Sequence, residues 1–143
     1  MCGRISFVTI LEAVAAEHDV TVEHLRGPSV RGSYAKVNWP RQRALMIARR
    51  VLPALSWGQL STQMNGRSRR NLGDQAQAAE KRYRAMASER RAVGRILARL
   101  GLDELPAYDE LQWQRVRLDR EIQALERKLT DMRAARAELG EAA

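Results

Sequence analysis

The sequence predicts an all-α fold in two parts. A helix-turn-helix domain is expected over residues 1–82, and an antiparallel, coiled-coil-like helical hairpin over residues 83–143. Three observations lead to this prediction. Short apolar segments with helical spacing alternate with turn signals up to residue 80. Leucines recur every seven residues in the last third of the chain. Alternating patterns that indicate strands are nearly absent.

The composition narrows the class of protein. Of the 143 residues 45% are hydrophobic but only 5% are aromatic, which suits an aliphatic core between packed helices. The single cysteine, Cys2, excludes an internal disulfide and fits a reducing compartment. No segment approaches the ~20 consecutive apolar residues that a membrane-spanning helix needs. We therefore expect a cytoplasmic protein with no membrane partner.

The beginning of the chain predicts two helices and a loop. Apolar residues recur at helical spacing over Ile5–His18. Thr21 can cap a short helix that runs through Leu25 and stops at a glycine-proline pair. Residues 26–38 are rich in glycine, serine and basic side chains. This composition is typical either of a solvated connector or of a basic arm that lies on DNA phosphates or enters a minor groove.

A long stretch of the sequence is basic without any acidic residue. Between Glu23 and Asp74 there is no aspartate or glutamate, although residues 1–74 as a whole carry 11 basic and 5 acidic side chains. Residues 75–143 carry 14 basic and 12 acidic ones. We therefore expect nucleic acid to bind the first part and protein to bind the second. The basic residues of this acid-free stretch are Arg26, Arg31, Lys36, Arg41, Arg43, Arg49, Arg50, Arg67, Arg69 and Arg70.

The middle of the chain predicts three successive helices. Pro40 fits the first turn of a helix that a later proline ends. Ser56 begins a capping box for the second helix. Asn65-Gly66 predicts a turn with positive φ, and Ser68 can cap the third helix. Helix, tight turn and helix at this spacing is the layout of a helix-turn-helix DNA reader.

The third of these helices is the expected DNA-reading element. A recognition helix contacts bases mainly through its N-terminal turns, and arginine–guanine and asparagine–adenine are favoured bidentate pairs. The residues expected to read bases are Arg67, Ser68, Arg69, Arg70 and Asn71. Those expected to contact the DNA backbone or the minor groove are Arg31, Lys36, Arg41, Arg43, Ser56 and Trp57.

Residues 8–82 contain a series of short motifs, namely Val14-Ala-Ala, Val22-Glu-His-Leu, Pro40-Arg-Gln, Ala48-Arg-Arg, Ser56 with Leu60, and Asn65-Gly66-Arg67. With these motifs the stretch resembles the C-terminal DNA-binding domain of the bacterial replication initiator DnaA. In that family a basic loop precedes a Pro-Arg-Gln helix, and a Gly-Gly-Arg-Asp-His-Thr-Thr signature opens the recognition helix. The resemblance implies that one arginine of the loop enters the minor groove, and Arg31 is the nearest candidate.

The sequence also departs from this family. Ser68-Arg-Arg-Asn stands where the family has Asp-His-Thr-Thr, and Gly58 stands where it commonly has proline. Because the signature positions touch bases in the family, we expect a different DNA target. No ATPase module or phosphate-cradling glycine loop is present, which places origin melting outside the chemistry of this chain.

The rest of the chain shows two heptad patterns. They run over Tyr83–Leu100 and Leu111–Leu139, with Gly101 and Pro106 as turn signals between them. We expect the resulting hairpin to brace the domain, to self-associate or to dock on another protein. Arginines at positions 90, 115 and 136 interrupt the pattern, which favours a defined register. The residues expected to support oligomerisation are Val93, Leu97, Leu100, Leu111, Leu118, Ile122, Leu125, Leu129 and Met132.

Together these features predict a sequence-specific double-stranded DNA-binding protein, a bacterial or phage transcriptional regulator that acts as a homo-oligomer or with a protein partner. Two alternatives stay open. One is a phage small-terminase-like DNA-packaging subunit, whose hairpin would assemble a ring, and the other is a replication-origin accessory protein. We expect no enzyme, cofactor or metal site, because the two histidines and one cysteine fit neither a catalytic set nor zinc-ligand spacing.

Overall fold

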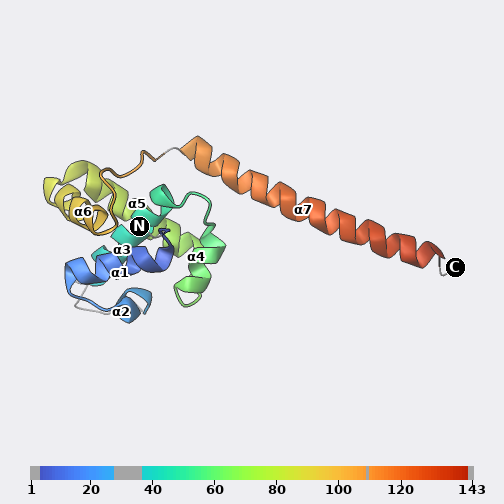
Figure 1. Cartoon of the computed structure of the whole chain (residues 1–143), viewed down its shortest axis with the longest axis horizontal. Helices are drawn as coiled ribbons and strands as arrows, with labels where there is room; N and C mark the ends of the chain where they lie inside the picture. Colours follow the sequence, from blue (N-terminus) through green and yellow to red (C-terminus); the bar gives the residue numbers. More distant parts are fainter. Residues whose placement is uncertain (1–3, 28–36, 109, 142–143) are drawn as a thin grey trace. The chain divides into compact units, whose positions relative to one another are not determined.

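The computed structural model describes residues 4–27, 37–108 and 110–141, and its regular structure there is entirely helical (Figure 1). The all-α prediction is confirmed. The chain divides into two compact units, residues 1–108 and 109–143. The second unit contains α7 (Glu110–Glu141). The first contains α1 (Phe7–His18), α2 (Val22–Arg26), α3 (Trp39–Val51), α4 (Trp57–Gln63), α5 (Arg69–Ala85) and α6 (Ala87–Arg99).

Short polar side chains begin the helices as the sequence predicts. The Thr21 hydroxyl accepts a hydrogen bond from the backbone N–H of His24 at 3.1 Å. The Ser56 hydroxyl accepts from the N–H of Gln59 at 3.2 Å, and the Gln59 side chain accepts in return from the N–H of Ser56 at 3.0 Å. Ser68 caps α5 in the same way. Each cap satisfies backbone donors that the first helical turn leaves without partners.

A tight turn joins α4 to α5. Asn65 and Gly66 have φ angles of 56° and 77°, as the Asn-Gly pair predicts. The Gly66 N–H donates to the carbonyl of Ser61 at 2.8 Å. The Ser61 hydroxyl donates to the carbonyl of Arg67. These bonds hold the last turn of α4 against the residues that lead into α5, and the two helices contact each other.

The core of the first unit surrounds α3. This helix contacts α1, α2 and α5, and all of residues 40–49 are buried. On either side it meets aliphatic residues of α1, such as Ile10 and Leu11, and the stripe of Leu72, Ala76 and Ala79 on α5, all of them buried. Because α3 also carries arginines in this buried stretch, their charges need partners inside the unit.

The structure corrects the predicted hairpin. The boundary expected after residue 82 lies inside α5, and Met86 then adopts an extended conformation between α5 and α6. Val93, Ile96 and Leu97 are buried where α6 packs on α1 and α5, so Val93 and Leu97 are not available for oligomerisation. The apolar stripe of α6 therefore completes the first unit and is not free to pair with a second hairpin helix. Arg90 donates to the carbonyls of Tyr83 and Arg84 and so caps the end of α5.

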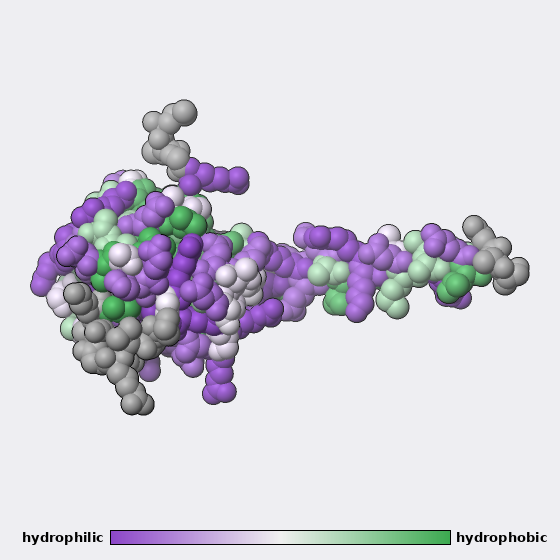
Figure 2. Space-filling model, turned by 90° about the horizontal axis from the view of Figure 1, so that it is seen from below, coloured by the Kyte–Doolittle hydropathy of each residue, from purple (hydrophilic) through white to green (hydrophobic). Residues whose placement is uncertain are grey.

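The second unit is a single 32-residue helix, α7, with an exposed apolar stripe. Figure 2 shows hydrophobic residues in green among hydrophilic residues in purple along this helix. Leu111, Leu118, Leu125 and Leu139 are among the exposed large hydrophobic residues. None of the helices in the described parts of the chain is long and apolar enough to cross a membrane.

Candidate nucleic-acid interface

Two arginines at the end of α3 point into the first unit and bind one carboxylate. Glu80, on α5, has 0% of its surface exposed. It accepts hydrogen bonds from Arg50 at 3.0 and 2.5 Å and from Arg49 at 3.1 Å. Burial acts to raise the pKa of Glu80, but the hydrogen bonds and charges of Arg50 and Arg49 lower it overall. These two arginines of the acid-free stretch are therefore used for the core.

A second buried pair links α3 to α6. Arg43 donates to both carboxylate oxygens of Glu89 at 2.6 and 2.7 Å, a bidentate arrangement. The same guanidinium lies 3.0 Å from the Nε2 atom of His18. Burial and the charge of Arg43 lower the pKa of His18. The prediction that Arg43 contacts the DNA backbone is wrong, because its charge is bound inside the unit.

Arg41 is fully buried and holds the end of α2. Its guanidinium donates to the carbonyls of Leu25, His24 and Gly27 at 2.6, 2.9 and 2.8 Å, and to the side chain of Asn38 at 2.8 Å. The carbonyls at a helix end lack intrahelical partners, so this arginine stabilises α2. Burial, with a contribution from the charge of Arg67, lowers the pKa of Arg41 to about 10. Its predicted contact with DNA is also wrong.

The other expected backbone contacts differ in their surroundings. Trp57 is only 7% exposed and belongs to the core, so its predicted contact with DNA is wrong. Ser56 is partly exposed and its hydroxyl is used in the capping box of α4. Arg31 and Lys36 lie outside the residues that the structure describes.

The turn between α4 and α5 is attached to the end of α2. The Asn65 side chain donates to the carbonyl of Arg26 at 3.1 Å, and Arg67 donates to the carbonyl of Gly27. Arg67 is partly buried, and this burial lowers its pKa. Arg67 therefore has a structural contact in addition to its predicted role in reading bases. The start of the basic stretch and the start of α5 consequently lie side by side.

The first turn of α5 presents a continuous polar surface. Ser68, Arg69, Arg70 and Asn71 are all exposed. The guanidinium of Arg69 lies over Gly58, where an added Cβ atom would come within 3.0 Å of it. Neither Arg69 nor Arg70 forms an ion pair with any described residue. The Asn71 side chain accepts a hydrogen bond from Gln75 at 2.5 Å, which orients its amide. We call Ser68, Arg69, Arg70 and Asn71 the α5 polar turn.

The sequence analysis did not predict that Glu80 and Glu89 are buried, although the position of each in its helix indicates it. Glu80 lies four residues after Ala76 on the apolar stripe of α5. Glu89 lies four residues before Val93 on the stripe of α6. An acidic residue on an apolar helical stripe predicts a buried ion pair, because a carboxylate is rarely buried without a partner. Both residues lie beyond the acid-free stretch whose arginines they neutralise.

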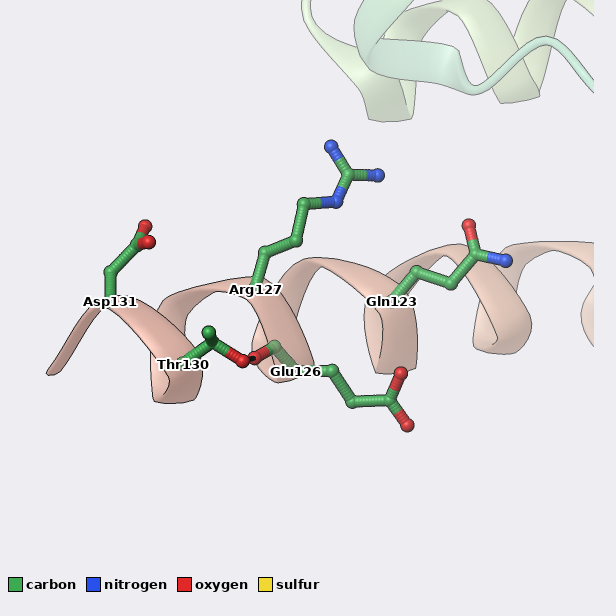
Figure 3. A pocket seen from close by; sticks show the side chains of 5 residues that line it. All are labelled: Gln123, Glu126, Arg127, Thr130 and Asp131. Atoms are coloured by element: carbon green, nitrogen blue, oxygen red, sulfur yellow. Dashed lines mark hydrogen bonds between the residues drawn. The ribbon is translucent and has the colours of Figure 1, made fainter. Parts of the chain in front are cut away.

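A surface hollow on α7 offers no second site. Figure 3 shows that Gln123, Arg127 and Asp131 project to one side of the helix and Glu126 to another. Thr130 completes the lining, and its hydroxyl donates to the carbonyl of Glu126 at 3.0 Å. Since one helix supplies all five residues, the hollow cannot enclose a ligand. Among the described residues there is also no group of three side chains suited to hold a metal ion.

No protein-family model matches the chain, and none of the curated proteins compared with it matches either. The resemblance to the initiator's DNA-binding domain therefore rests on the sequence motifs themselves.

Proposed function

We propose that this chain binds double-stranded DNA and reads its sequence by placing the α5 polar turn in the major groove. One observation carries the proposal. Arg69 and Arg70 are exposed on the first turn of α5, while Arg41, Arg43 and Arg49 of the same acid-free stretch are buried with internal partners. A cation at a helix N-terminus is disfavoured by the helix dipole. Base acceptors or phosphates of a bound duplex would offset that local cost.

The residue chemistry assigns the roles. A guanidinium can donate two hydrogen bonds to the O6 and N7 atoms of guanine, which suits Arg69 and Arg70. The amide of Asn71 can pair with the N6 and N7 atoms of adenine. The attached end of α2 brings the start of the basic stretch beside this turn, so that residues there can contact the phosphates next to the bases being read.

Within this proposal the chain acts as a bacterial or phage transcriptional regulator. A packaging subunit is less well supported, because its expected hairpin would need α6, whose apolar stripe is buried in the first unit. An origin accessory would share the same DNA-reading surface. Footprinting on genomic DNA would separate these roles, because it would locate the bound site at a promoter, a packaging site or an origin.

Selection of a binding site from random duplexes, followed by affinity measurements, tests the proposal. We expect Arg69→Ala or Arg70→Ala to reduce the preference for the selected site over unrelated DNA by ~1–3 kcal/mol, the value of one bidentate base contact. Arg91→Ala, which removes an exposed arginine of α6, is the matched control and should leave that preference unchanged. The proposal fails if the chain retains no duplex at low salt, or if the α5 variants lose affinity equally on every sequence.

A further inference from the structure

The apolar stripe of α7 is exposed along the helix. We call Leu111, Leu118, Ile122, Leu125, Leu129, Met132 and Leu139 the α7 seam, and each of these residues is 47–74% exposed. Leu111, Leu118, Leu125, Met132 and Leu139 recur every seven residues and define one core position of a heptad. The other core position holds Ile122 and Leu129 in the middle, with Arg115 and Arg136 on either side. An exposed stripe with this period is the pattern of a helix that pairs with another helix.

The charges that flank the α7 seam are segregated along the helix. Positions directly beside a heptad core face the partner helix and decide which pairings are favourable. The charged flanking residues up to Glu126 are acidic, whereas those beyond it are basic. The acidic residues are Asp119, Glu121 and Glu126, and the basic ones are Lys128 and Arg133.

A parallel pair of these helices would place like charges together. In a parallel coiled coil a flanking residue at position g of the heptad, such as Glu121 or Lys128, meets the residue five positions further along the second helix. Glu121 would then face Glu126 of a second copy, and Lys128 would face Arg133. The core arginine Arg136 would face its own counterpart, as equal core positions do in a parallel dimer. Like charges in these places oppose the parallel arrangement.

An antiparallel pair reverses this relation. We propose that α7 of one chain pairs antiparallel with α7 of a second copy along the α7 seam, so that the protein is a homodimer. At both ends of the pair Asp119 of one helix then faces Arg133 of the other, and only Glu126 and Lys128, near the centre, face their own counterparts. The antiparallel pair therefore has fewer like-charge contacts than the parallel one. Arg115 and Arg136 face leucine or methionine of the second copy instead of another arginine. The central layers contain only Ile122, Leu125, Leu129 and their neighbouring apolar residues.

The charge pattern favours a second copy over an unrelated protein. A two-fold symmetric dimer requires a surface that complements itself. The α7 seam meets this condition, because its acidic and basic halves occupy the same face of the same helix. The opposite face carries the polar residues Gln123, Arg127 and Asp131 (Figure 3), so one side of α7 is suited to apolar pairing and the other to water. This inference goes beyond the proposed DNA binding and does not depend on it.

Mass measurement of the full chain tests the assembly. We expect a particle of twice the mass of the 16.2 kDa chain. Leu125→Lys, in the middle of the α7 seam, should give the monomer. Ala124→Lys places the same charge on the neighbouring exposed position outside the seam and should leave the dimer intact. A monomer or an assembly larger than a dimer for the unchanged chain, or equal behaviour of the two variants, would overturn the proposal.

Spin-label distances test the orientation. In a Cys2→Ser background, a label on Ala137→Cys lies near one end of the α7 seam and outside it. At 1.5 Å rise per residue, the two labels of an antiparallel pair should be ~30–40 Å apart, against roughly 20 Å or less in a parallel pair. A label on Ala124→Cys, near the middle, should give a short distance in both arrangements and serves as the control. A short distance for both positions would overturn the antiparallel arrangement.

Discussion

At the scale of single residues, the first unit contains two buried carboxylates. Glu80 and Glu89 are almost completely buried, and each accepts hydrogen bonds from arginines of α3. Removing one partner from such a group leaves the other charges in a medium where they are poorly solvated. The first unit therefore depends on these carboxylates more than on pairs with an exposed partner, such as that of Glu17 with Arg95, whose arginine side chain is 57% exposed.

Replacing Glu80 tests this dependence. We expect Glu80→Gln to lower the free energy of unfolding by ~3–5 kcal/mol, because it leaves Arg49 and Arg50 without their buried counter-charge. Asp74→Asn, on an exposed position of the same helix, should change it by less than ~0.5 kcal/mol. Denaturant titration measures both. Equal stability of the two variants would mean that water or other groups solvate these arginines.

His18 makes stability depend on pH. Because burial and the charge of Arg43 lower its pKa in the folded chain, the unfolded chain binds a proton first as the pH falls. The contribution of His18 is thus fully present above its unfolded pKa of ~6.5 and is lost between that value and the lower folded pKa. We expect His18→Gln to reduce the slope of the free energy of unfolding against pH in this window. An unchanged slope in this variant would show that His18 is not the group responsible.

At the scale of helices, the contact of α4 with α5 links the stability of α4 to the position of Arg69, the side chain that we propose reads bases. Gly58 on α4 leaves room for the guanidinium of Arg69, and a Cβ atom there would displace only the end of that flexible side chain. Glycine is unfavourable within a helix by up to ~1 kcal/mol relative to alanine. An alanine at position 58 should therefore stabilise the folded chain and at the same time displace the Arg69 side chain, a candidate for reading bases.

Gly58→Ala separates the two effects. We expect a gain in unfolding free energy of up to ~1 kcal/mol, together with a changed base preference where Arg69 reads the site. Gly73→Ala on α5, where a Cβ atom meets nothing within 4 Å, should give a comparable gain with the base preference unchanged. Thermal unfolding and binding-site selection are the measurements. An unchanged preference in both variants would show that Arg69 does not read bases from this position.

At the scale of the whole molecule, the chain divides into two units, and the first ends at Tyr108. Of the side chains whose burial the structure describes, the buried hydrophobic ones all lie between Phe7 and Leu97. After α6 the chain still contributes to this unit, because Arg49 lies 4.0 Å above the ring of Tyr108 and Arg50 donates to the carbonyl of Pro106 at 3.1 Å.

Truncation tests this division. In a chain that ends at Tyr108, the first unit should unfold with the same free energy as in the full chain to within ~0.5 kcal/mol, because pairing through α7 stabilises only the second unit. A chain that ends at Leu100 should lose about 1–3 kcal/mol, because it lacks the cation–π contact and the hydrogen bond made by α3 arginines. Equal stability of the two truncated chains would mean that residues 101–108 contribute nothing. A large loss on removing α7 alone would show that the first unit is not independent.

The sequence by itself determined the elements of local structure. Caps at Thr21, Ser56 and Ser68 and the positive-φ turn at Asn65-Gly66 depend on residues three or four apart, so they can be read directly from the chain. The seven-residue period of α7 was visible for the same reason. The exposed positions of Arg69 and Arg70 also follow from the helical spacing of α5.

Tertiary structure alone decided which charges and which apolar stripes are free. A count of charges in one stretch cannot include Glu80 and Glu89, which reach the arginines of α3 from other helices. A heptad pattern indicates that a helix has an apolar face, but it does not indicate what covers that face. The patterns of α6 and α7 are therefore alike in the sequence. In the fold, α1 and α5 present apolar surface to α6, and its stripe is buried there. Burial depends on contacts between distant segments, and those contacts exist only after the chain has folded.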